Sequence, residues 1–194
     1  MKKIILKSSL ITIGALMAAG ILFFSLWILI SPQSMATVSE KLRNYDFAVT
    51  CANLKYKYSD DTADLARCAE DSILSKKDKL ILKYCEELID RDDFSQLCTR
   101  RDGELSSQVG QYTTATDYKT YIIGTLAAAQ YRSGDLEKAV QTAERGGNVD
   151  CFRKLVLEVV LRNNEDDIQK VQTLPKDSAL REGISDFIKV LLEK

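Results

Sequence analysis

The residues with the most reactive side chains are five cysteines, Cys51, Cys68, Cys85, Cys98 and Cys151, in a sequence that contains no histidine. The lack of histidine excludes Ser-His-Asp and Cys-His catalysis, HExxH zinc sites and Cys/His zinc fingers. No two cysteines have the CxxC spacing of a redox or zinc motif. We therefore expect these cysteines to be structural.

The cysteine spacing predicts two disulfides if the chain folds into antiparallel helical hairpins. Two residues equally far from a turn lie at the same height, so Cys51 would face Cys68 and Cys85 would face Cys98. The turns expected at the centres of these pairs are at Ser59-Asp60 and Arg91-Asp92. Disulfides are expected in an oxidising compartment outside the cytoplasm.

Two alternatives to this pairing remain open. A link between Cys68 and Cys85 would be centred near Lys76, which is also turn-like, and would leave the other two cysteines unpaired. The first four cysteines also lie on apolar helical stripes, so they could be buried free thiols. Cys151 is expected to be a small core residue or an intermolecular thiol.

Carboxylate clusters are the remaining candidates for catalysis, as in a glycosidase that uses two acids about 5 to 9.5 Å apart. The clusters are Glu86, Glu87 and Asp90, and Glu165, Asp166 and Asp167. Charge runs near helix ends usually form solvated surfaces. The sequence has no GxGxxG, no GxxxxGK[ST] and no EF-hand loop, and Asn164–Asp167 lacks the alternating ligands of a calcium site. We expect no catalysis, no cofactor and no bound metal.

The N-terminus carries the signal of a membrane anchor. Leu10–Ile30 is an uncharged run of 21 residues preceded by Lys2, Lys3 and Lys7. A helix of that length spans the hydrocarbon core of a bilayer, about 30 Å, and exceeds the h-region of most signal peptides. The lysines predict a cytoplasmic N-terminus, which leaves residues 40–194 outside the cytoplasm.

Three further expectations concern the anchor and the charge of the chain. Ser34-Met35-Ala36 has the small-x-small pattern of a signal peptidase site, so a protein cleaved after Ala36 and secreted is the alternative. Gly14 with Ala18, and Ala15 with Ala19, could pair two anchors into a homo-oligomer, or could simply face lipid.

Beyond residue 30 the chain has 24 basic and 28 acidic residues, which disfavours nucleic acid as a partner.

Only two prolines, nine glycines and apolar repeats near 3.6 residues predict an all-α fold. We expect four regions: a tail and anchor at 1–35, cysteine-bearing hairpins at 36–100, a loop at 101–116, and hairpins with a capping helix at 117–194. The expected helices beyond the anchor are 36–57, 61–74, 77–90, 93–100, 117–132, 135–145, 149–163, 166–173 and 177–193. At four positions an Asp followed by an apolar residue is expected to open a helix directly after a polar turn. These pairs are Asp46-Phe47, Asp93-Phe94, Asp135-Leu136 and Asp167-Ile168.

The clearest internal unit is IGTLAAAQYRSGDLEKAV, at 123–140, which continues to Gly146. It resembles the tetratricopeptide repeat, in which small residues of two helices, here Ala127 and Ala139, allow a close approach. Gly134 would make the turn and Gly146 would take a later small position. The resemblance implies an α-solenoid of stacked hairpins that presents its first helices to protein partners. The implied contact residues are Tyr118, Lys119, Tyr121 and Gln130.

These observations predict a single-pass membrane protein whose hairpins serve as an adaptor for protein partners in the cell envelope. The alternative is a compact helical effector, inhibitor or immunity-type protein stapled by disulfides. The two are distinguished by whether residues 40–100 form a closed bundle independent of the C-terminal half.

Overall fold

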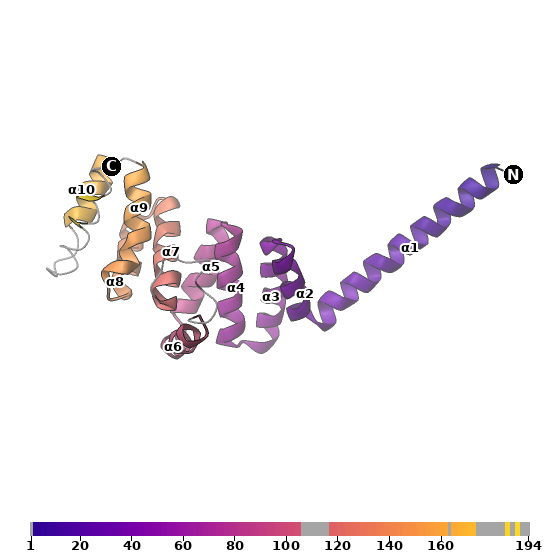
Figure 1. The fold of residues 1–194 in the computed structure, drawn as a ribbon, viewed down its shortest axis with the longest axis horizontal. Helices are drawn as coiled ribbons and strands as arrows, with labels where there is room; N and C mark the ends of the chain where they lie inside the picture. The colour runs from indigo at the N-terminus through magenta and orange to yellow at the C-terminus, as the bar shows by residue number, and fades with distance from the viewer. Residues whose placement is uncertain (1, 106–116, 163, 174–184, 187–188, 191–194) are drawn as a thin grey trace.

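The computed structural model describes residues 2–105, 117–162, 164–173, 185–186 and 189–190 (Figure 1). Within these residues the regular elements are all helical and none is a strand, which confirms the all-α expectation. The helices are α1 (Lys2–Ile30), α2 (Pro32–Lys41), α3 (Tyr45–Ser59), α4 (Thr62–Ser75), α5 (Asp78–Ile89), α6 (Phe94–Leu105), α7 (Tyr118–Arg132), α8 (Leu136–Arg145), the 3₁₀ helix η2 (Val149–Phe152), α9 (Arg153–Arg162) and α10 (Glu165–Thr173).

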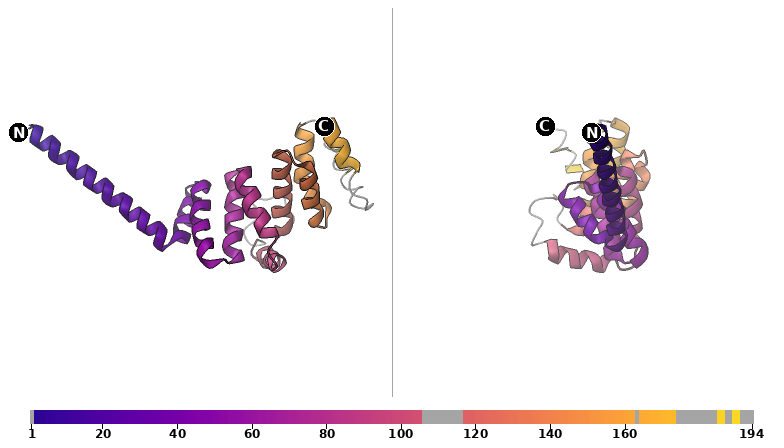
Figure 2. Two further views of the ribbon diagram at one scale, coloured as in Figure 1. Left: turned by 180° about the vertical axis from the view of Figure 1, so that it is seen from behind. Right: turned by 90° about the vertical axis from the view of Figure 1, so that its right-hand side faces the viewer.

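Helix α1 projects from the packed helices (Figures 1 and 2), and most of the apolar side chains described between residues 12 and 30 are exposed. Between residues 12 and 30 only Ile28 is half-buried, against the first packed helices. The stretch Thr12–Ile30 is long and apolar enough to cross a membrane. The helix ends at Ile30, because Pro32 disfavours the helical conformation at Ser31, the residue before it, and takes the first position of α2.

The predicted helix at 36–57 is wrong, because the chain turns between α2 and α3. Arg43 adopts a left-handed conformation with φ of 56°. Asn44 then caps α3 by accepting a hydrogen bond from the Phe47 N–H at 3.3 Å. The break between α2 and α3 is therefore stabilised by the Asn44 cap, although the apolar pattern of the sequence continues across it.

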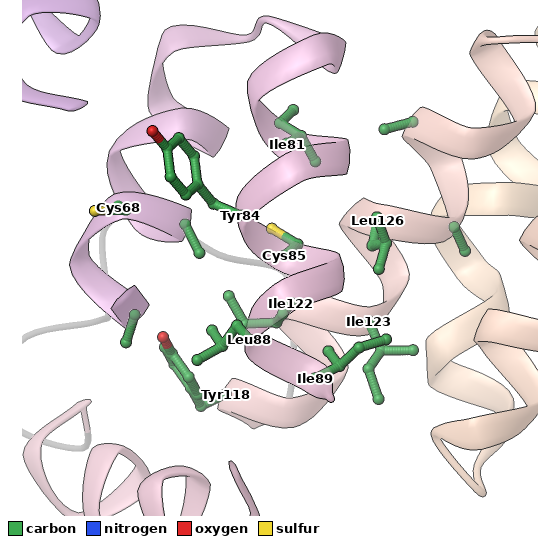
Figure 3. Close-up of a cluster of buried hydrophobic side chains, with 14 of the residues drawn as sticks. Cys68, Ile81, Tyr84, Cys85, Leu88, Ile89, Tyr118, Ile122, Ile123 and Leu126 are labelled. Atoms are coloured by element: carbon green, nitrogen blue, oxygen red, sulfur yellow. The ribbon is translucent and has the colours of Figure 1, made fainter. Parts of the chain in front are cut away.

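The packed helices follow one another along the molecule. α2 packs against α3, α3 against α4, α4 against α5, and α5 against α7, while α7 contacts α8 and α9 (Figures 1 and 2). Buried residues from α4, α5 and α7 interlock in one cluster, which includes Leu88, Ile122 and Leu126 (Figure 3). The N-terminal and C-terminal hairpins consequently share a continuous core.

Helix α6 departs from the antiparallel order. It is seen end-on in Figure 1 and makes its main contacts with α7 and α4. It also continues to Leu105, so the loop predicted at 101–116 begins too early, and residues 106–116 lie outside the described part.

The hairpin of α7 and α8 forms where the repeat-like unit predicts two helices joined by a turn. Ala127 and Ala139 are both fully buried. Gly134 makes the turn with φ of +98°, a conformation that costs a side chain energy and glycine little. Asp135 caps α8 by accepting a hydrogen bond from the Lys138 N–H at 2.9 Å. Local signals therefore fixed this hairpin.

The C-terminal helices differ in detail from the prediction. The segment expected at 149–163 is η2 followed by α9. Asn164, and not Asp167, accepts hydrogen bonds at the start of α10, so Asp167 lies in the first turn rather than opening the helix. Most of the capping helix expected at 177–193 lies outside the described residues.

Candidate functional site

Two of the four predicted partner contacts lie in the interior. Tyr118 is 2% exposed and donates a hydrogen bond to Glu70 Oε1 of α4 at 2.8 Å. Gln130 is 1% exposed and its Nε2 donates to Glu86 Oε1 of α5 at 2.9 Å. Both side chains therefore hold α7 against the preceding hairpin, and neither is available to a partner.

The other two predicted contacts, Lys119 and Tyr121, are half-buried on α7. The ammonium group of Lys154, on α9, lies 4.6 Å from the centroid of the Tyr121 ring. This distance is that of a cation–π contact. Of the four predicted partner contacts, Tyr121 is therefore the one that lies beside polar side chains of both α7 and α9.

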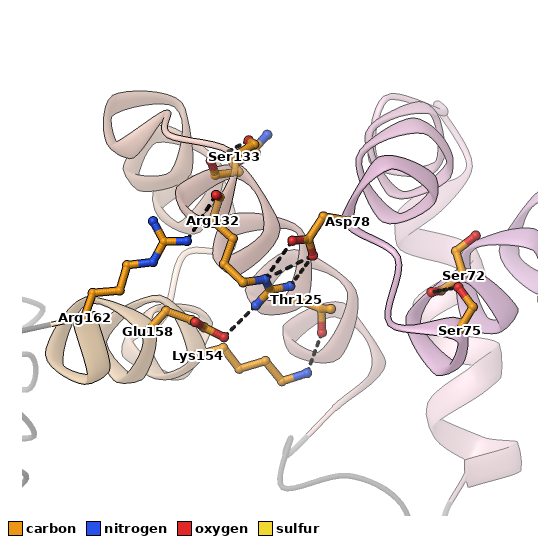
Figure 4. Close-up of polar contacts among 10 residues, drawn as sticks. Ser72, Ser75, Asp78, Thr125, Arg132, Ser133, Lys154, Glu158 and Arg162 are labelled. Carbon is orange, nitrogen blue, oxygen red and sulfur yellow. Dashed lines mark hydrogen bonds and ion pairs between the residues drawn. The ribbon is translucent and has the colours of Figure 1, made fainter.

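We define the α7–α9 face by the residues Tyr121, Thr125, Arg132, Lys154, Glu158 and Arg162. On α9 the last three follow one another at intervals of four residues, which places them on one side of the helix. Figure 4 shows this side of α9 beside Thr125 and Arg132 of α7. Sequence analysis missed all of these residues except Tyr121.

Arg132 ties three helices together at this face. Its Nη2 donates to Asp78 Oδ1 of α5 at 2.6 Å, and its Nη1 donates to Glu158 Oε1 of α9 at 2.6 Å (Figure 4). Charge-assisted bonds from a planar guanidinium to two carboxylates fix direction as well as distance. Arg132 thereby fixes the positions of α5 and α9 on either side of α7.

Lys154 differs from Arg132 because no carboxylate within the described residues pairs with it. Its Nζ donates a hydrogen bond to the Thr125 hydroxyl (Figure 4). Burial is the main cause that lowers the pKa of Lys154 to about 8, and the nearby Arg132 adds to the decrease. The face therefore contains a partly buried cation whose charge is not balanced.

Arg162 is the exposed end of the same stripe. Its guanidinium stacks 5.0 Å from the centroid of the Tyr131 ring, and Nη2 donates to the Arg132 carbonyl oxygen at 3.1 Å. These contacts leave its charge without a carboxylate in the described part of the chain. The α7–α9 face consequently carries the half-buried ring of Tyr121 and two cations, Lys154 and Arg162, without a paired carboxylate among the described residues.

The predicted disulfides are not formed, and all five cysteines are free and buried. The turn between α3 and α4 lies at Asp60 and Asp61, so Glu70, rather than Cys68, is as far from the turn as Cys51. The turn centre predicted from sequence was one residue too early.

The second predicted disulfide fails because α6 does not fold back along α5. Cys98 lies on α6, which crosses the other helices, whereas Cys85 lies in the cluster with α7 (Figure 3). The alternative pair is not formed either, and the Cys68 sulfur points away from Cys85 (Figure 3). Burial raises the pKa of both Cys68 and Cys85 to about 12, which keeps them as unreactive thiols.

Cys151 has a packing role in the hairpin of α7 and α8. It is fully buried where Gly146, at the end of α8, approaches the η2 helix. A Cβ atom added to Gly146 would lie 2.1 Å from Cys151 Sγ. The late small position of the unit therefore makes room for this thiol.

The first carboxylate cluster considered for catalysis makes contacts between helices. Glu86 pairs with Lys138 at 2.6 Å, Glu87 accepts a hydrogen bond from Tyr56, and Asp90 pairs with Arg145 at 2.8 Å. In the second cluster, Asp167 accepts a hydrogen bond from the Tyr131 hydroxyl at 3.0 Å. Among the described residues no group of three Cys, Asp or Glu side chains could hold a metal ion.

The sequence matches no protein-family model, and comparisons with curated proteins and with solved structures give no match.

Proposed function

We propose that the protein is a single-pass membrane protein that holds a tetratricopeptide-like adaptor outside the cytoplasm. The adaptor stacks its hairpins as an α-solenoid, binds a partner protein of the cell envelope through the α7–α9 face, and catalyses no reaction. The observation that carries this proposal is the uncovered apolar helix α1, which continues directly into a row of packed helices. A water-soluble protein rarely leaves so large an apolar surface exposed.

The surroundings of the candidate cleavage site support an anchor that is retained. Met35 and Ala36 are buried within α2, where they pack in the core. Cleavage after Ala36 would remove half of α2 and the part of the core that these residues form. The lysines at the N-terminus favour the cytoplasm for that end by the positive-inside rule.

The continuous core supports the adaptor over a compact effector. Residues 40–100 do not form a closed bundle, because α5 packs against α7 and Arg132 bonds to Asp78. The free cysteines also remove the staples on which the compact alternative depends. The unbalanced cations of Lys154 and Arg162 favour partner binding at the α7–α9 face, since such groups attract an opposite charge.

Topology is tested by fusing a reporter that is active only outside the cytoplasm to Lys194. We expect activity from this fusion and retention of the protein in membranes washed at alkaline pH. Activity of a cytoplasmic reporter at the same position would reverse the topology. A mature N-terminus at Thr37 would show that the protein is secreted.

Binding is tested by crosslinking in native membranes followed by purification of the tagged full-length protein. Arg162→Glu should reduce the yield of the crosslinked partner, because it reverses a charge on the α7–α9 face. Arg100→Glu, an equal change at an exposed position on α6, is the matched control. Equal yields from both variants would count against the α7–α9 face.

A further inference from the structure

Arg67, on α4, bonds to α2, the helix that follows α1, and so connects α2 to the other packed helices. Its Nε and Nη2 atoms, on α4, donate to Glu40 Oε1 of α2 at 2.9 and 2.7 Å. Nη2 also donates to the Thr37 hydroxyl of α2 at 2.7 Å. Because α2 begins directly after α1, this contact connects the anchor-proximal helix to α4.

A second acid lies where Arg67 would ordinarily find a partner. Asp71 follows Arg67 by four residues on α4, the spacing at which opposite charges on a helix pair. Asp71 is 2% exposed, yet its Oδ2 atom has no hydrogen-bond partner within the described residues. Arg67 therefore forms its ion pair with Glu40 of the neighbouring helix and not with Asp71 of its own helix.

The charges around Asp71 leave one carboxyl group in excess. The groups that face it are Glu40 of α2, Cys51 of α3, and Arg67, Cys68 and Glu70 of α4. Arg67 forms an ion pair with Glu40. The Nη2 atom of Arg101, on α6, lies 3.3 Å from Glu70 Oε1, and the Tyr118 hydroxyl donates a hydrogen bond to the same oxygen. Among the residues that the structure describes, no salt bridge to Asp71 is formed.

A proton is the group that balances this excess. Burial, followed by the charge of Glu40, raises the pKa of Asp71 to about 8. The carboxyl group is thus mostly protonated at pH 7 and loses its proton in mildly alkaline solution. Once ionised in a buried site, it requires a cation, and Arg67 is the nearest one on its own helix.

We propose that Asp71 and Glu40 compete for Arg67, and that the proton on Asp71 decides which of them binds it. With the proton in place, Arg67 bonds Glu40 and holds α2 on α4. When the proton passes to solvent, Arg67 turns to Asp71, and α2 loses its bond to α4. The junction between anchor and array therefore loosens in alkaline solution.

The test compares hydrogen exchange of residues 35–41 in the full-length protein and in its Asp71→Asn variant, both in detergent. Comparison at one pH cancels the effect of pH on exchange chemistry. At pH 9, one unit above the pKa of Asp71, the ionised form outnumbers the protonated form about tenfold. We expect these amides to exchange faster in the wild-type protein than in the variant at pH 9, and this excess, relative to the intrinsic rate, to be about tenfold smaller at pH 7, where about a tenth of the Asp71 carboxyl groups are ionised.

Asp92→Asn, at an exposed position between α5 and α6, is the matched control and should behave as the wild type. Equal exchange in the wild type and the Asp71→Asn variant at pH 9 would overturn the proposal. If the Asp71→Asn variant does not fold, Glu40→Gln gives a second test, since it removes the competing charge and should give fast exchange at both pH values. Slow exchange in this variant at pH 7 would equally overturn the switch. Neither result bears on partner binding at the α7–α9 face, so the proposed function is tested separately.

Discussion

Replacing Gly146 by alanine should destabilise the protein through one contact, although a helical backbone ordinarily favours the change. Gly146 has φ of −65°, where alanine is preferred to glycine by about 1 kcal/mol. Here the added Cβ would lie 2.1 Å from Cys151 Sγ and 2.8 Å from Cys151 Cβ. Ordinary contacts between such atoms are about 3.5 to 4 Å, so the thiol must move within a filled core.

The expected cost of this overpacking is about 1 to 3 kcal/mol. For a domain of this size, each kcal/mol lowers the thermal midpoint by about 2 to 4 °C. After the backbone preference of about 1 kcal/mol is subtracted, the net loss is up to about 2 kcal/mol, so we expect Gly146→Ala to lower the midpoint measured by circular dichroism by up to about 8 °C. Gly124→Ala, whose Cβ would lie 3.2 Å from the Cys151 carbonyl oxygen, should cost less.

A double-mutant cycle identifies the contact responsible. Cys151→Ala removes the sulfur, so Gly146→Ala should cost at least about 1 kcal/mol less in that background. An equal cost in both backgrounds would refute the role assigned to Cys151. A higher midpoint for Gly146→Ala alone would show that the backbone preference exceeds the overlap.

Three further predictions concern the interior. Ala127→Leu and Ala139→Leu, at fully buried positions between α7 and α8, should each cost about 1 to 3 kcal/mol in a denaturant titration; unchanged unfolding midpoints would mean that neither position is a close helix contact. Lys154→Met should raise the thermal midpoint, and the gain should be largest below pH 8, where the wild-type protein buries a charged lysine. The gain should shrink between pH 8 and the ordinary pKa of lysine, because the folded wild-type protein binds fewer protons in this range than the unfolded chain. A gain that does not vary with pH would contradict the lowered pKa of Lys154. Iodoacetamide should leave all five cysteines unmodified in the native protein and modify all five in denaturant, as judged by mass spectrometry; masses two hydrogens lower per pair would reveal disulfides instead.

The hairpin of α7 and α8 could be predicted because its determinants are local. Gly134 marks the turn, Asp135 caps the next helix, and the buried Ala127 and Ala139 lie a few residues on either side. The apolar helix α1 is equally local, since length and lack of charge suffice to recognise it. A helix start was recognised at Asp46-Phe47, but the expected helix 36–57 ran across the turn before it, because no glycine or proline accompanies the cap at Asn44.

The cysteine pairing and the α7–α9 face depended on contacts that spacing does not encode. The direction of α6 is set by its packing on α7 and α4, and this direction separates Cys98 from Cys85. Arg132 finds Asp78 across 54 positions of sequence, so neither residue identified the other. The predicted contacts Tyr118 and Gln130 were misplaced because polar side chains of α7 reach acids on earlier helices.

The most direct test of the adaptor is photo-crosslinking in native membranes, with a benzophenone amino acid in place of Tyr121. This position lies on the α7–α9 face, and an aromatic replacement keeps the ring beneath Lys154. The same amino acid in place of Gln141, exposed on α8, is the control. The account predicts a discrete protein adduct from membrane-bound protein at position 121 and none at position 141. No adduct at position 121, or the same adduct at both positions, would contradict it.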